Sequence, residues 1–91
     1  MSEVILRPIG KFDIPVEAEV ISPDVFAGKN IDEIKNLTVL QGPWEHKLSE
    51  FFEVSGEAGE SPEETTIVIE GDVDRVKLIG YRMSNGKIVI N

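Results

Sequence analysis

Residues 67–70 read Ile-Val-Ile-Glu and residues 88–91 read Ile-Val-Ile-Asn, so nearly the same four residues occur twice, twenty-one positions apart. A spacing of this size is typical of solenoids, in which each repeat forms one coil and the stacked coils form the core. Because stacked strands lie about 4.8 Å apart, we expect Ile67 to lie over Ile88 and Ile69 over Ile90. The repeat thus predicts an aliphatic ladder inside a β-solenoid.

Three glycines accompany the apolar runs. Gly71 follows the first copy, Gly80 ends a second β-branched run at residues 76–79, and Gly86 lies in the turn before the second copy. Glycine lets the backbone turn without a Cβ clash, so we expect these three at the corners of the coil. An ordinary antiparallel hairpin is the alternative, because the Asn-Gly pair at residues 85–86 is typical of a type I′ turn. The residues alone do not choose between the coil and the hairpin.

A polar stretch divides the chain into three parts. Residues 56–64 consist of Gly, Glu, Ser and Pro with a single apolar residue, Ala58, which predicts an acidic loop. Residues 1–55 before it form a mixed region, and residues 65–91 after it carry the repeat. A chain of 91 residues is expected to fold these parts into one compact domain. The four glutamates of the loop lack a fixed geometry, so we expect a solvated loop and no cation site there.

The mixed region predicts short elements. Alternating apolar residues at 16–21 indicate a strand with one buried face. Ser22, followed by a proline, is typical of a helix N-cap, and Gly28 would end that helix. A second helical turn is expected at residues 31–35 with Asn30 or Asp32 as its cap, and a strand follows at residues 37–40, which the next Gly-Pro pair ends.

The composition excludes several classes of partner. The chain carries a net charge of −8, with nine basic residues against seventeen acidic ones. Nucleic acids and anionic membranes are bound through lysine and arginine, so neither is an expected partner. The absence of cysteine excludes disulfides and thiolate-bound iron–sulfur or zinc sites. Without an apolar run of membrane-spanning length or a secretory leader, the sequence predicts a cytoplasmic protein.

No catalytic motif occurs in the sequence. His46, the single histidine, lies two residues after Trp44, and a lone histidine is usually a surface or packing residue. Asp72 and Asp74 have the spacing of the first ligands in a calcium loop, but the later ligand positions are missing. We expect them to be solvated at a corner or to pair with Arg75. The sequence thus predicts no catalytic, cofactor-binding or metal-binding residue in this chain.

Two stretches resemble one known family. Residues 65–91 contain Ile-Glu-Gly-Asp-Val at 69–73 and Asn-Gly-Lys-Ile-Val-Ile-Asn at 85–91, which resembles the opening of the GXGXG right-handed β-helix. That fold is shared by the C-terminal domain of the glutamate synthase large subunit and by the C subunit of formylmethanofuran dehydrogenase. Residues 38–43, residues 48–54 and the acidic loop resemble the N-terminal region of this C subunit. The resemblance favours the dehydrogenase and covers about the first third of a full-length subunit.

The resemblance implies a scaffold in an enzyme complex of methanogenic archaea. The complex reduces carbon dioxide and transfers the formyl group to methanofuran during methanogenesis. Its tungsto- or molybdopterin, its iron–sulfur clusters and its binuclear metal site belong to other subunits, which are the implied partners of this chain. The implied fold is mainly β with one or two short helices. An irregular N-terminal β/α region would lead into the first coil of a right-handed β-helix.

Two functions are compatible with these residues. One is a structural subunit, or an N-terminal fragment of one, that holds catalytic subunits in place. The other is a free-standing module that binds a small molecule or metal. Trp44 and the Phe51-Phe52 pair should be buried or face a partner in the first case and line a pocket in the second. If residues 87–90 form a solenoid strand, we expect a two-fold dimer through its outer edge unless another subunit lies over it.

Overall fold

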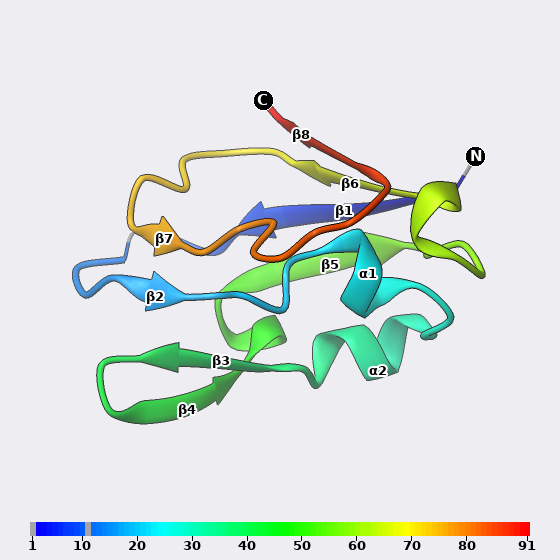
Figure 1. Ribbon diagram of the computed structural model, residues 1–91. Coiled ribbons are helices and arrows are strands. Elements are labelled where there is room, and N and C mark those ends of the chain that lie inside the picture. Colours follow the sequence, from blue (N-terminus) through cyan, green and yellow to red (C-terminus); the bar gives the residue numbers. More distant parts are fainter. Residues whose placement is uncertain (1, 11) are drawn as a thin grey trace.

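The computed structural model describes residues 2–10 and 12–91, drawn in Figure 1. The strands are β1 (Ser2–Pro8), β2 (Val16–Glu17), β3 (Thr38–Gln41), β4 (Trp44–Lys47), β5 (Phe52–Gly56), β6 (Thr65–Ile69), β7 (Val76–Lys77) and β8 (Lys87–Ile90). The helices are α1 (Pro23–Phe26) and α2 (Ile31–Lys35), and the 3-10 turns are η1 (Leu48–Glu50) and η2 (Pro62–Glu64). The result is a small α/β domain with short helices and mixed sheets.

The chain passes repeatedly from one sheet to the other. β1 lies in a sheet of order β5-β1-β6-β8, and β2 lies in a sheet of order β4-β3-β2-β7. After residues 18–64 the chain returns with β6 beside β1 and β7 beside β2, and β8 then lies beside β6. Each of these three pairings is parallel, and Figure 1 shows β1, β6 and β8 one above another. The chain thus visits the two sheets in turn.

The two copies of the repeat pair with each other. β6 and β8 are parallel, with Ile67 opposite Ile88 and Ile69 opposite Ile90. This is the register that the repeat predicts. The hairpin alternative is wrong, because residues 81–83 lie in a turn and β8 pairs with β6 instead.

The ladder also contains a strand that the sequence did not predict. β1 pairs in parallel with β6, so that Val4 lies opposite Ile67 and Leu6 opposite Ile69. All four side chains are fully buried on one face, as expected when residues two apart point the same way. Val4, Ile5 and Leu6 form a continuous apolar run, which gives no alternation by which a strand could be recognised.

Residues 18–64 cover the ladder at its β1 and β2 end. β5 pairs antiparallel with β1, while β3 pairs antiparallel with β2 and forms a hairpin with β4. In Figure 1 these strands lie on the side of β1 and β2 opposite to β8, and the helices lie beside them. The parallel ladder thus begins against antiparallel strands and ends at β7 and β8.

Both helices begin where the sequence predicts. The Ser22 hydroxyl accepts from the Asp24 N–H over 3.2 Å, and Gly28, at φ +76°, follows the end of α1. Asn30 is the N-cap of α2, and its side chain and that of Glu33 bond reciprocally to the backbone in a capping box. These observed bonds show that Asn30, and not Asp32, is the cap of α2.

The predicted strands differ in extent from the observed ones. The strand expected at residues 16–21 is only two residues long, and Ile21 is buried more fully than Val20. The second strand ends at Gln41, one residue later than predicted, and the following β4 was not predicted. Gly56, placed in the acidic loop by its composition, ends β5. The limits of β2 and of β5 reflect pairing with strands far along the chain, whereas β4 pairs with the neighbouring β3 but has no apolar alternation of its own.

One hydrophobic core joins both sheets and both helices. Its buried members are Val4, Leu6, Val16, Ala18, Ile21, Phe26, Ile34, Val39, Leu48, Phe52, Val54, Ile67, Ile69 and Val76.

No helix of the described residues is long and apolar enough to cross a membrane.

Candidate functional site

The candidate site is the end of the ladder at which β7 and β8 are the outermost strands. Leu6, Ile69 and Ile90 form one column along the inner face of the first sheet. The first two side chains are fully buried, whereas 56% of Ile90 is exposed. The exposed fraction thus rises from Ile69 to Ile90 at the outermost strand, whereas Ile88 stays partly buried against the core.

The outer edge of β8 has unpaired backbone groups. The Asn91 N–H donates to the Ile69 carbonyl over 2.9 Å. Backbone N–H groups alternate sides along a strand, so the Val89 N–H also faces β6, while those of Ile88 and Ile90 face outward. Within residues 2–10 and 12–91, no strand pairs with this outward edge. An edge of this kind is a template for a further strand.

The turn before β8 is fixed by a carboxylate from α1. Asp24 accepts from the Ser84 N–H over 3.1 Å, from the Ser84 hydroxyl, and from the Asn85 N–H over 3.4 Å. These bonds, the hydroxyl bond first, lower the pKa of the Asp24 carboxyl. The contact joins residues 60 apart in the chain, and no local sequence signal could have revealed it.

Gly86 also holds the turn before β8 against the rest of the domain, and together with the Asp24 hydrogen bonds it forms the anchor of β8. Its φ is +89°, and a Cβ built there would lie 2.5 Å from the Pro62 carbonyl oxygen and closer still to Pro23 Cβ. Glycine is therefore required both by the backbone angle and by the close approach of α1 and η2. The two contacts place the start of β8 against the rest of the domain.

The other two glycines of the repeat also lie in bends. Gly71 follows β6, at φ +137°, where a Cβ would lie 2.9 Å from Pro8 Cδ. Gly80 lies in the turn after β7, at φ +76°, and its N–H donates to the Ile21 carbonyl over 2.8 Å.

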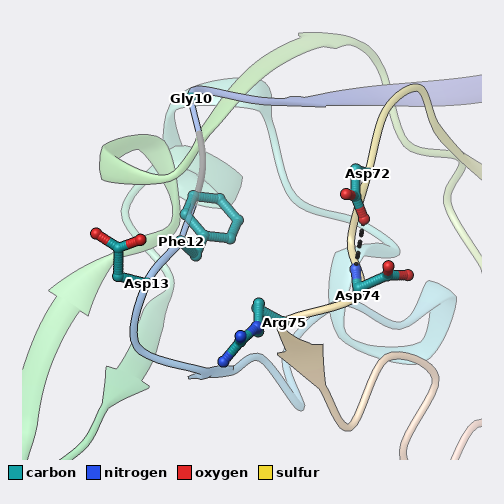
Figure 2. A pocket seen from close by; sticks show the side chains of 6 residues that line it. All are labelled: Gly10, Phe12, Asp13, Asp72, Asp74 and Arg75. Carbon is teal, nitrogen blue, oxygen red and sulfur yellow. Dashed lines mark hydrogen bonds between the residues drawn. The ribbon is translucent and has the colours of Figure 1, made fainter.

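A cavity of about 260 Å³ lies where the β1–β2 and β6–β7 connections meet. Figure 2 shows its lining residues, which are Gly10, Phe12, Asp13, Asp72, Asp74 and Arg75. The Asp72 carboxylate accepts from the Asp74 N–H over 2.9 Å. Asp13 lies across the cavity beyond Phe12, so the carboxylates do not converge.

Asp72, Asp74 and Arg75 lie in the bend of the chain between β6 and β7. Arg75 points away from both Asp72 and Asp74 in Figure 2, and the described residues include no ion pair between them. Of the two expected arrangements, solvation at a corner and pairing with Arg75, the structure has the first, and the Asp72 contact is a local turn bond. Among residues 2–10 and 12–91, no group of three or more His, Asp or Glu side chains could hold a metal ion.

The aromatic residues and the histidine separate into different environments. Phe52 is 1% exposed and belongs to the core, whereas Trp44, near the β3–β4 turn, is 59% exposed. The His46 ring packs edge-on against Phe51 at 5.2 Å between centroids, with Nδ1 3.2 Å from Glu50 Oε1. The Lys47 N–H and then His46 lower the pKa of the Glu50 carboxyl. His46 is thus a surface packing residue, and Trp44 does not line the cavity of Figure 2.

Comparison with known proteins finds homologues among the subunits of one enzyme. No protein-family profile matches the sequence. The homologues are the C subunits of formylmethanofuran dehydrogenases, in both tungsten- and molybdenum-containing forms. They support the resemblance to this C subunit that the sequence motifs suggested.

Particular relatives come from methanogens. The chain is 51% identical over 90 residues to the C subunit of tungsten-containing formylmethanofuran dehydrogenase 2 of Methanothermobacter wolfeii. It is 57% identical over 90 residues to the C subunit of molybdenum-containing formylmethanofuran dehydrogenase 1 of Methanosarcina barkeri. Each match covers 99% of this chain but only 33% and 30% of the two relatives. The chain therefore spans about a third of the length of the curated relatives that it matches.

Proposed function

We propose that this chain is the capped first part of the C subunit of a formylmethanofuran dehydrogenase and that its role is structural. Sequence identity of about half over 99% of the chain supports the relationship. The observation that carries the structural role is the parallel register of the two repeat copies, in which Ile67 lies opposite Ile88 and Ile69 opposite Ile90. Parallel strands that place like aliphatic residues side by side form a stacking scaffold and not a catalytic cleft.

The fold that we propose for the longer protein is a right-handed β-helix of the GXGXG family. The parallel pairings of β1 with β6, β2 with β7 and β6 with β8 are those that successive coils would make. Connections between parallel strands of one sheet are almost always right-handed, which supports this handedness. The glycines at residues 71, 80 and 86, each at positive φ, would form its corners.

In this proposal β5 and the β3–β4 hairpin are the cap of the β-helix. Their antiparallel pairing with β1 and β2 uses the edges on which an earlier coil would otherwise stack. Further coils would then be added only beside β7 and β8. A further coil or another subunit would cover β8, and a second copy of the chain would pair with it in a two-fold dimer when neither is present.

The proposal assigns the redox chemistry of the complex to partner subunits. The iron–sulfur clusters need thiolate ligands that this chain does not offer, since it has no cysteine, and the tungsto- or molybdopterin would lie with them in the partner subunits. The carboxylates around the cavity of Figure 2 do not converge on a common point. A cytoplasmic location with the rest of the complex belongs to the same proposal.

A free-standing binding module is not favoured. The homologues are subunits of an enzyme, and Phe52 lies in the hydrophobic core where it can bind no ligand. Trp44, exposed at the hairpin tip, fits a partner-facing residue better than a pocket wall.

The edge of β8 is tested by two proline variants of the chain. Ile90→Pro removes an outward N–H and leaves the bonds to β6, whereas Val89→Pro removes an inward one. We expect the parent chain to sediment as a dimer and Ile90→Pro as a folded monomer. Val89→Pro should instead loosen β8 itself and lower the thermal midpoint. A parent chain that remains monomeric at high concentration would contradict the open-edge argument.

The assignment to the complex is tested by co-expression with the other subunits of the Methanosarcina barkeri enzyme. We expect a tagged chain to copurify with them and to carry no pterin or cluster after it is separated. A chain that folds, as judged by circular dichroism, and yet binds none of these subunits would overturn the scaffold role.

A further inference from the structure

A groove on the outer face of the second sheet lies apart from the β8 edge. Its volume is about 390 Å³, and residues of β2, β3 and β4 and of the segment after β7 line it. Val16 and Val39 point into the core, so their strand neighbours Glu17, Thr38 and Leu40 point outward. The groove therefore lies on the solvent-facing side of the second sheet, whose other face packs into the core.

The floor of the groove is apolar. Leu40 is 37% exposed and Leu78 is 41% exposed, and Val20 lies between the groove and a second hollow of about 300 Å³. That hollow adds Tyr81, which is 44% exposed. The two hollows share Glu19 and Val20, so they form one continuous surface. Exposed apolar side chains gathered in one hollow are typical of interaction sites.

The rim of the groove is acidic. Leu40 lies opposite Glu17 on β2 and opposite Glu45 on β4, so a carboxylate flanks this leucine on each neighbouring strand. Glu19 adds a third carboxylate at the same groove. In the described part of the chain, none of these three glutamates has a hydrogen bond or an ion pair through its side chain. Lys77, opposite Glu17 on β7, is the nearest cation by register and does not pair with it.

Leu78 reaches the groove from a backbone conformation that leucine rarely adopts. Its φ is +68°, in the left-handed region, where a branched side chain costs free energy that glycine would not. Arg82, which lines the adjoining hollow, also has a positive φ of 57°. Backbone strain of this kind is concentrated at positions with a function, and here it coincides with an exposed apolar side chain.

We propose that this groove is a docking surface for a segment of a partner protein in which lysine or arginine alternates with apolar residues. The aliphatic stem of a basic side chain would lie along Leu40 and Leu78, and its cation would lie between Glu17 and Glu45. The net charge of −8 attracts such a segment and repels an acidic one. The surface lies on the second sheet, whereas the β8 edge belongs to the first sheet.

The probe for this surface is a fluorescent peptide of alternating lysine and leucine, with a peptide of alternating glutamate and leucine as its counterpart. Binding to the whole chain is followed by fluorescence anisotropy at physiological salt. We expect the lysine peptide to bind and the glutamate peptide not to bind. The double variant Glu17→Gln/Glu45→Gln should raise the Kd of the lysine peptide about five- to twentyfold.

Two further variants separate docking from general charge and from stability. Glu57→Gln/Glu63→Gln changes the net charge by the same amount at exposed positions outside the groove and should change the Kd less than about twofold. Leu78→Gly relieves the left-handed conformation, so its thermal midpoint should stay within about 5 °C of the parent while the Kd rises. Equal effects of the two double variants, or unchanged binding by Leu78→Gly, would overturn the proposal.

Discussion

The anchor of β8 predicts that Gly86→Ala is far more damaging than an ordinary glycine substitution. An alanine in the left-handed region costs about 1–2 kcal/mol. The added Cβ would also overlap Pro23 and the Pro62 carbonyl, and overpacking of this kind costs about 1–3 kcal/mol. Restriction of the unfolded chain returns about 0.4–1 kcal/mol. We expect a net loss of about 2–4 kcal/mol from a total stability of about 5–15 kcal/mol.

Gly28→Ala is the matched control. Gly28 has a φ of +76°, and a Cβ there would meet only the Glu60 carbonyl oxygen, at 3.8 Å. The backbone penalty is therefore similar and the overlap is absent, so the expected loss is about 1 kcal/mol. Urea unfolding of both variants measures the difference, which we expect to be about 1–3 kcal/mol in favour of Gly28→Ala. Equal losses would show that the turn before β8 is not packed against α1 and η2.

Three other predictions follow from the same geometry. Because hydrogen bonds lower the pKa of Asp24 in the folded chain, its stabilisation is present above the ordinary value of 3.8 and is lost as the pH falls through the lower folded pKa. The thermal midpoints of the parent and of Asp24→Asn should therefore converge at low pH. A difference between the two midpoints that persists at low pH would contradict a stabilising role of the ionised Asp24 carboxylate. In the monomeric chain the outward amides of Ile88 and Ile90 should exchange hydrogen faster than that of Val89, and a reversed order by NMR would refute the register of the edge. Elemental analysis of the isolated chain should find no stoichiometric tungsten, molybdenum, iron or zinc, and one tightly bound ion per chain would contradict the structural role.

The ladder and the helix caps could be predicted because their signals are local. The repeat at residues 67–70 and 88–91 gives the register of β6 and β8 directly, since stacked strands place like residues side by side. Ser22 and Asn30 begin the helices because short polar side chains satisfy N–H groups within three residues. In both cases the partners that fix the structure lie within one repeat or one turn.

What could not be predicted either depends on partners far apart in the chain or lacks a local apolar pattern. β1 has no alternation because Val4, Ile5 and Leu6 are all apolar, so only its pairing with β5 and β6 reveals it. The sequence of β4 is polar and joins the sheet by completing a hairpin with β3. The groove needs Glu17, Leu40 and Glu45 from three strands, and no spacing along the chain brings these residues together.

The free edges of the two sheets differ in a way that singles out β8. β4 carries Glu45 and Lys47, and charged residues of this kind discourage pairing with another chain. β5 packs against α2 and η1, and β7 is two residues long and includes Lys77. β8 has a single charged residue, Lys87, at its beginning, followed by three aliphatic residues. In the function proposed above, β8 is therefore the edge at which a further strand would pair. The exposed Ile90 would then belong to the surface that this strand covers.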